Sequence, residues 1–216
     1  DRLIEEKKRG MTIELNFVWL QTAKGRVGII DVPGHQELVR TFVIGAMQVD
    51  TFLFVLAADD GWMPQSEEHL EVLTCLGVRK GIGIVTKTDL VSIKRVLEVK
   101  EDFKKRLFEA TGTDIEVFSF SAVHGNIVLI RDCLETLLDQ FPAPRDKKTA
   151  RLWVDRVFSP KGQGTVVTGS LREGTIRVGD EVIVAPLQAR GSVKGIEIFG
   201  KSVESASSVT RIALQL

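Results

Sequence analysis

The segment DVPGH at residues 31–35 carries the residue types that a phosphate-binding and phosphate-cleaving site needs. A carboxylate at the end of a strand can hold Mg²⁺, usually through water. A glycine lets a backbone N–H approach a phosphate, and a helix that begins at Gln36 would add free N–H groups and a positive dipole end. His35 stands where a water that attacks the terminal phosphate must be held. The same pattern also fits a plain strand-turn-helix with a surface histidine, so other segments must decide.

A second polar group, Thr86-Lys87-Thr88-Asp89, directly follows an apolar segment that is typical of a strand. The carboxylate of Asp89 could accept two parallel hydrogen bonds from the ring N–H and the exocyclic amine of guanine, while the Lys87 stem lies over the base. Adenine offers no such donor pair. A lone Lys-x-Asp is usually a surface pair, but this one is accompanied by DVPGH and by a later Ser-Ala turn.

Apolar periodicity predicts strands that alternate with helices. The predicted strands are 13–20, 26–31, 51–57, 81–86 and 116–120, and the predicted helices are 36–49, 65–76, 93–110 and 126–141. The first two strands should form an antiparallel hairpin, and the strands together should form a doubly wound parallel α/β sheet with one antiparallel edge strand. We expect 51–57, apolar on both faces, to be a central strand. Ligands of such sheets bind at the carboxyl ends of strands, where 31–35, 59–61, 86–89 and 121–122 carry the most unusual polar residues.

Proline and charge after residue 141 predict a linker and a change of fold class. The resulting domains are 1–143, which would bind the nucleotide, a linker at 144–150, and 151–216. In the last of these, short β-rich runs separated by glycines predict a small β-barrel.

The composition excludes few classes of protein, but it limits the size of the core and the kinds of partner that the sequence indicates. The chain has 216 residues, 44% of them apolar, and its 29 basic and 29 acidic residues cancel, so no global field marks a nucleic-acid or membrane binder. The longest strongly apolar run, 51–58, is far short of a membrane span. Cys75 and Cys133 lie in apolar helical patterns, which predicts buried, reduced thiols and a cytosolic protein.

Taken together, these motifs resemble those of the translational GTPases, and among them the selenocysteine-specific elongation factors. The matching segments are KKRGMTI (7–13) for the first switch, DVPGH (31–35) for the second, TKTD (86–89) and FSA (120–122) for guanine binding, and DDGWMPQSEEHL (59–70). Most members of the wider group carry Asn where this chain has Thr86, which favours the selenocysteine branch. The resemblance continues through 154–182 to 211–216.

The resemblance implies a GTPase domain of the P-loop type that binds GTP or GDP with Mg²⁺. Thr12 and Asp31 would hold the metal, Gly34 would donate its N–H to the terminal phosphate, and His35 would position the attacking water.

The resemblance also assigns the base site. Thr86 would brace its loop, Lys87 and Asp89 would bind guanine, and Ser121 and Ala122 would contact the base edge through their backbone.

In the second domain, Asp155, Arg156 and Arg211 match positions implicated in the family's aminoacyl pocket. Two guanidinium groups beside an acidic residue would favour a selenolate, although each arginine also fits a cation on the barrel surface.

The implied partners are selenocysteinyl-tRNA, the ribosome, and a messenger-RNA hairpin bound through domains outside this chain. The implied protein is a cytoplasmic monomer that binds no membrane.

The sequence departs from the pattern of this family at one point, which limits these expectations. The phosphate loop GxxxxGK[ST] does not occur in the 216 residues. We therefore expect a strand, that loop and a helix to precede Asp1, further domains to follow the barrel, and this fragment to be inactive alone. Two alternatives stay open: a related factor for ordinary aminoacyl-tRNA, and a non-hydrolysing binding module with the same fold.

Overall fold

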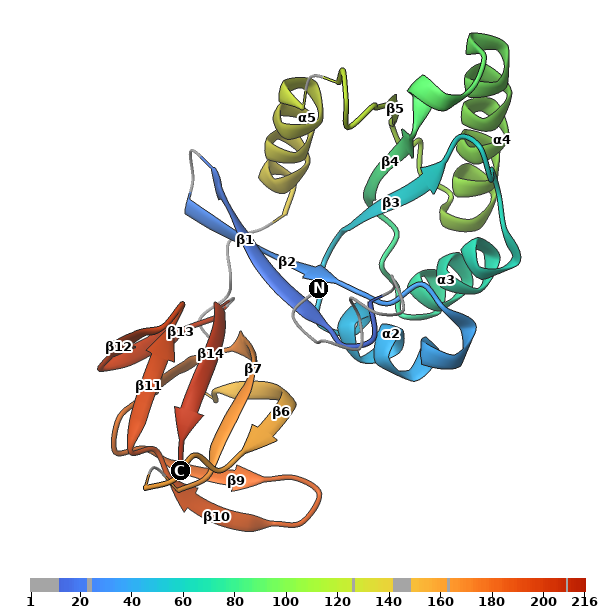
Figure 1. Cartoon of the computed structure of the whole chain (residues 1–216). Coiled ribbons are helices and arrows are strands. Elements are labelled where there is room, and N and C mark those ends of the chain that lie inside the picture. The colour runs from blue at the N-terminus through green and yellow to red at the C-terminus, as the bar shows by residue number, and fades with distance from the viewer. Residues whose placement is uncertain (1–11, 23–24, 126, 142–148, 163, 209) are drawn as a thin grey trace. The chain divides into compact units, whose positions relative to one another are not determined.

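The computed structural model describes residues 12–22, 25–125, 127–141, 149–162, 164–208 and 210–216. The chain divides into two compact units, 1–141 and 142–216, which are described separately below (Figure 1). Residues 7–11 of the predicted first switch, and 144–148 of the predicted linker, lie outside the described residues.

The first unit contains every strand and helix that the sequence predicts for it, with ends shifted by a few residues. In chain order they are β1 (Asn16–Thr22), β2 (Gly25–Asp31), η1 (Gln36–Leu38), α2 (Val39–Ala46), β3 (Phe52–Ala57), α3 (Pro64–Cys75), β4 (Gly81–Thr86), η2 (Thr88–Leu90), α4 (Ile93–Thr111), β5 (Val117–Ser119) and α5 (Val128–Asp139). The mixed α/β content of this unit is therefore confirmed.

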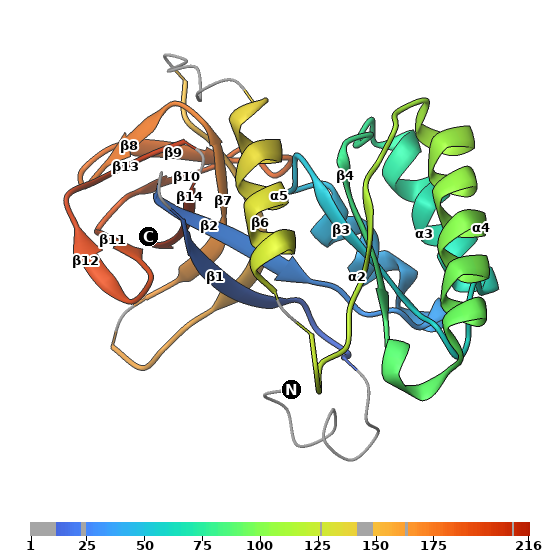
Figure 2. The ribbon, with the colours of Figure 1, turned by 90° about the horizontal axis from the view of Figure 1, so that it is seen from above.

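Three parallel strands in the order β3-β4-β5 form the centre of this unit. Helices α3 and α4 cover one face, where Phe54, Val85 and Phe103 belong to one buried cluster. Helix α5 covers the opposite face, where Ile84 packs with Leu134 (Figure 2). Because all three strands run the same way, their carboxyl ends lie at one edge of the sheet.

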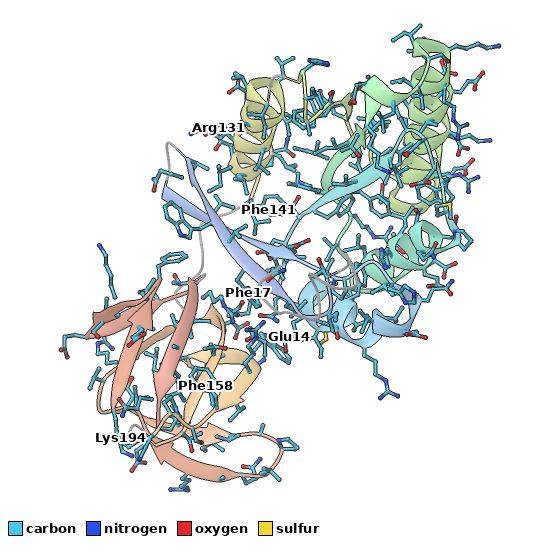
Figure 3. All side chains as sticks on the ribbon, in the orientation of Figure 1. Glu14, Phe17, Arg131, Phe141, Phe158 and Lys194 are labelled. Atoms are coloured by element: carbon cyan, nitrogen blue, oxygen red, sulfur yellow. The ribbon has the colours of Figure 1, made fainter. Side chains whose placement is uncertain are left out.

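The predicted antiparallel edge of this sheet is not found. Within the described residues, β1 and β2 pair only with each other and form a separate two-stranded sheet. The chain leaves β2 through α2 and enters β3, whose ladder partner is β4. Side chains and α5 hold the hairpin instead: Arg131 Nη2 donates to the Gln21 carbonyl at 2.9 Å (Figure 3).

The prediction of β3 as a covered central strand is likewise wrong for the described residues, in which β3 forms one edge of the three-stranded sheet. Its residues alternate between buried and exposed, and 54% of Val55 is exposed. An apolar sequence on both faces of a strand shows that both faces can be covered, but the neighbouring elements decide whether they are.

Two glycines in β4 allow its neighbours to approach closely. A Cβ on Gly81 would lie 2.6 Å from the backbone oxygen of Phe52, and one on Gly83 would lie 3.0 Å from Cε1 of Phe103. These glycines therefore serve packing, as expected for a strand and not for a phosphate loop.

The second unit consists of strands only. They are β6 (Arg151–Phe158), β7 (Val166–Glu173), β8 (Thr175–Arg177), β9 (Glu181–Val184), β10 (Ala189–Ser192), β11 (Gly195–Ile198), β12 (Lys201–Val203), β13 (Ser205–Ser207) and β14 (Thr210–Gln215). Five of them form a sheet in the order β12-β11-β14-β7-β6, and two further pairs are β9-β10 and β8-β13. Leu171, Ile196 and Ile212 are buried at its core. The predicted β-rich composition is thus confirmed.

The cysteines differ in part from expectation. Both thiols are free, as predicted, but Cys75 is exposed because it ends α3, and Cys133 is only half-buried. No helix in the described part of the chain is long and apolar enough to cross a membrane.

Replacing Gly81 by alanine should destabilise the first unit by about 1–3 kcal/mol, because the new methyl group meets a backbone oxygen that cannot rotate away. Urea unfolding monitored by circular dichroism measures this loss. The matched control is Gly28→Ala in β2, where a Cβ meets nothing within 4 Å and the change should stay within about 0.5 kcal/mol. Equal effects of the two variants would contradict the packing argument.

Candidate functional site

Three strand ends bring together the polar residues that sequence analysis selected near the predicted base site. Asp59 and Asp60 follow β3, Lys87 and Asp89 follow β4, and Ser121 follows β5. The predicted convergence at the carboxyl ends is therefore found for three of the four segments. The fourth, DVPGH, follows β2 in the separate hairpin.

Hydrogen bonds fix these strand ends to one another. The Ala58 N–H donates to the Thr86 carbonyl at 2.9 Å, and the Phe120 N–H donates to the Val85 carbonyl at 2.8 Å. The Thr86 hydroxyl adds a bond of 3.0 Å to the Leu56 carbonyl. Thr86 thereby ties the end of β4 to the end of β3, directly before the loop that carries Lys87.

Lys87 adopts a backbone conformation that is uncommon for a residue with a side chain, with φ 55° and ψ 32°. Its ammonium lies 3.0 Å from a carboxylate oxygen of Asp59 and 3.7 Å from one of Asp60. The hydrogen bond between them lowers the pKa of the Asp59 carboxyl and raises the pKa of Lys87. Both partners are therefore charged at neutral pH.

Asp89 is ordered by the loop that follows β5. A hydrogen bond from the Ser121 hydroxyl is the main cause that lowers the pKa of the Asp89 carboxyl. The Ser121 oxygen also accepts the backbone N–H groups of Val123 and His124, both at 3.2 Å, and Ser121 is buried. Ser121 thus links the two loops that resemble guanine-binding motifs, while Ala122 beside it is exposed.

The loop after β3 carries contacts that sequence analysis did not assign. Arg95 in the first turn of α4 donates from Nε to the Ala58 carbonyl at 3.3 Å. Trp62 stacks on Phe54 with ring centroids 5.8 Å apart and donates to Glu67 at 2.9 Å. Sequence analysis selects 59–61 as a polar strand end and 59–70 for its resemblance but gives neither a contact, and Arg95 gives no signal because a helix-surface arginine has no distinctive spacing.

His35 caps the short helix η1 that opens the segment after DVPGH. Its Nδ1 accepts the backbone N–H of Glu37 at 3.3 Å, and the residue is exposed. The segment is held from α3 by a side-chain hydrogen bond of 3.4 Å from Gln36 to Glu68. With Nδ1 engaged by this bond, Nε2 is the ring nitrogen that would be available to a ligand.

Thr12 and Asp31 emerge from the same end of the β1–β2 hairpin, because Asn16 pairs with Asp31 and the chain continues beyond both residues. In the described residues, no group of three or more His, Cys, Asp or Glu side chains could hold a metal. Mg²⁺ usually needs only one or two carboxylates together with phosphate oxygens and water. The exposed carboxylate of Asp31 is the kind of ligand that such a site uses, and its pairing with the Thr12 hydroxyl stays a prediction.

In the second unit, a β-bulge decides where Asp155 points. Val154 pairs with Gly169 and Arg156 pairs with Thr168, so Asp155 is the extra residue of β6. Its side chain is 1% exposed and forms a two-pronged ion pair with Arg211 of β14, one arm of which measures 2.9 Å.

Thr168 completes this cluster by donating to Asp155 at 2.9 Å. The structure thus brings Asp155 and Arg211 together and leaves Arg156 exposed beside them.

Comparison with known proteins identifies the first unit. Residues 1–143 match the family model described as the elongation factor Tu GTP binding domain. A selenocysteine-specific elongation factor from Desulfomicrobium baculatum is 41% identical over 218 residues, covering 100% of this chain and 34% of that protein. Elongation factor 1-alpha from Pyrococcus furiosus is 36% identical, covering 95% of this chain and 53% of its own length.

A solved structure agrees with these relatives over the whole chain. The crystal structure of a bacterial selenocysteine-specific elongation factor, EF-Sec, has a TM-score of 0.92 and 33% identity, covering 100% of this chain and 38% of that one. The chain therefore spans between a third and about half of the length of the proteins it matches.

Removing the Arg211 side chain should leave the buried Asp155 carboxylate without its ion-pair partner. Arg211→Met is expected to lower the free energy of unfolding by about 3 kcal/mol, because a buried charge loses its partner. Arg156→Met on the exposed neighbour is the control and should cost less than about 1 kcal/mol. Chemical denaturation of each variant measures the difference, and adding Asp155→Asn to Arg211→Met should recover part of the loss.

Proposed function

The chain belongs to the family of the elongation factor Tu GTP-binding domain, the translational GTPases, and we propose that the full-length protein hydrolyses GTP to deliver selenocysteinyl-tRNA to the ribosome. The observation that carries this proposal is the convergence of Lys87, Asp89 and Ser121 at the carboxyl ends of β4 and β5. These residues stand at the motif positions that resemble the family's guanine-binding segments.

Guanine recognition follows from the state of Asp89. Its carboxylate, whose pKa is lowered mainly by the hydrogen bond from Ser121, would accept both donors of the guanine edge. The backbone at Ser121 and Ala122 would meet the base edge, and the aliphatic stem of Lys87 would cover the base plane. Thr86 would hold the loop through its bond to the Leu56 carbonyl.

Hydrolysis would take place at the open end of the hairpin. Asp31 and Thr12 would hold Mg²⁺, which supplies charge stabilisation for the phosphates, and the Gly34 N–H would bind the terminal phosphate. His35 would orient the attacking water with the ring nitrogen that does not accept from Glu37. Its capping bond fixes the direction in which that nitrogen points.

The second unit would be the β-barrel domain that receives the aminoacyl end of the tRNA. We assign 1–143 to the GTP-binding domain, 144–150 to the linker and 151–216 to the barrel. Asp155, Arg156 and Arg211 would favour a selenolate over a neutral hydroxyl, with Asp155 holding Arg211 in place.

The full-length protein would act as a cytoplasmic monomer and read a messenger-RNA hairpin through domains outside this chain. A factor for ordinary aminoacyl-tRNA is the second candidate, because elongation factor 1-alpha matches 95% of the chain at 36% identity.

Nucleotide turnover by the full-length protein tests the enzymatic part. His35→Ala should slow ribosome-stimulated hydrolysis by about a hundredfold or more, because the attacking water would lose the side chain that we propose orients it. Asp89→Asn should weaken GTP binding and shift preference towards xanthine nucleotides, since asparagine donates where guanine also donates. A wild-type protein that neither binds nor hydrolyses GTP would instead support the non-hydrolysing binding module.

Discrimination between aminoacyl groups tests the tRNA assignment. Arg156→Ala in the full-length protein should reduce the preference for selenocysteinyl-tRNA over seryl-tRNA by about five- to tenfold, the size expected when one charge-assisted contact is lost. Affinities measured with GTP bound provide the readout. A wild-type protein without any such preference, unaffected by Arg156→Ala, would favour the ordinary aminoacyl-tRNA factor.

A further inference from the structure

We propose that Asp59 is a positioning residue for guanine binding, because its carboxylate holds the ammonium of Lys87 so that the lysine stem presents one fixed apolar surface to the base. Asp60 assists from a longer distance. The inference rests on the proposed GTP-binding function and deepens it by giving a task to the segment 59–70, which that function does not use.

The contacts of Lys87 support this assignment. Its ammonium lies 3.0 Å from Asp59 and 3.7 Å from Asp60, and these carboxylates come from the end of the adjacent strand. The Lys87 side chain is 47% exposed, so packing alone does not fix it. The hydrogen bond to Asp59 is also the largest cause that raises the pKa of Lys87.

The loop that carries Asp59 is itself held from two sides. Arg95 of α4 donates to the Ala58 carbonyl, and Gly61, with φ 74°, lets the chain turn beneath the same guanidinium. A Cβ on Gly61 would lie 2.9 Å from Arg95 Nη2. Trp62 then anchors the far end of the loop on Phe54. Asp59 is therefore presented by a fixed backbone, which an ordinary surface carboxylate lacks.

The backbone conformation of Lys87 explains why a contact between its ammonium and Asp59 would help nucleotide binding. Its left-handed conformation sets where the side chain starts, but a lysine stem has four rotatable bonds and loses conformational entropy when a ligand orders it. An ammonium that is already held at its far end reduces that loss before the base arrives. Guanine nucleotides would then bind a lysine stem that is already ordered before binding.

The size of the effect should be modest, because an exposed ion pair contributes little. Asp59→Asn is expected to weaken GDP and GTP binding by about two- to fivefold, mainly through faster dissociation. The loss should shrink as salt concentration rises, since salt screens exposed pairs. The maximal hydrolysis rate at saturating GTP should not change, because Asp59 does not contact the reacting phosphate in this scheme.

A double-mutant cycle in the full-length protein tests the mechanism. Lys87→Met keeps an apolar stem and removes the charge, so Asp59→Asn should have no further effect on nucleotide affinity in that background. A loss of the same size with either lysine or methionine at residue 87 would overturn the proposal, because Asp59 would then act through the general structure of its loop.

Asp114→Asn is the matched control. Asp114 forms an equally short exposed ion pair of 3.0 Å with Lys104, away from the base site, and its loss should leave nucleotide affinity unchanged. Fluorescent GDP dissociation rates provide the readout for all variants. If wild-type protein binds GDP and Asp59→Asn binds equally well, only this inference fails. If wild-type protein does not bind guanine nucleotides, the proposed function fails.

Discussion

The parallel pairing of β3, β4 and β5 is the constraint on which the first unit depends. Parallel ladders place all three carboxyl ends at one edge, and the bonds at Ala58, Thr86 and Phe120 hold those ends in fixed register. The residues that emerge there are far apart in sequence, yet they share one short stretch of sheet edge. The glycines of β4 contribute indirectly, because they let Phe52 and Phe103 pack against the strand.

The proposed base site shows how this edge of the sheet orders side chains that are mostly exposed. Ser121 is buried, its hydroxyl oxygen accepts two backbone N–H groups of the turn after β5, and its hydrogen bond to Asp89 ties that carboxylate to the same turn. Lys87 is fixed through its backbone and through its ammonium, at opposite ends of the side chain. Contacts within the chain thus hold these side chains, and nucleotide binding at the proposed site would need less ordering than at a set of free surface residues.

The second unit solves a different problem, which is how to keep a buried carboxylate among its strands without leaving its charge unpaired. The bulge in β6 turns Asp155 inward, and the Thr168 hydroxyl donates a hydrogen bond to the same carboxylate. Arg211 consequently has one geometry, set by two bonds to Asp155. A buried pair of this kind adds little net stability, but it specifies the position of the guanidinium closely.

The sequence by itself determined the helices and strands of the first unit and the β-rich character of the second. It also determined the polar strand ends and the motifs that place the chain among the translational GTPases. These depend on local periodicity and on short spacings, which are visible in one chain. Only the tertiary structure decided that β1 and β2 stand apart from the parallel sheet and that Val55 is exposed. It alone joined Asp59 to Lys87 and Asp155 to Arg211, because strand neighbours and bulges are set by long-range packing that no local pattern encodes.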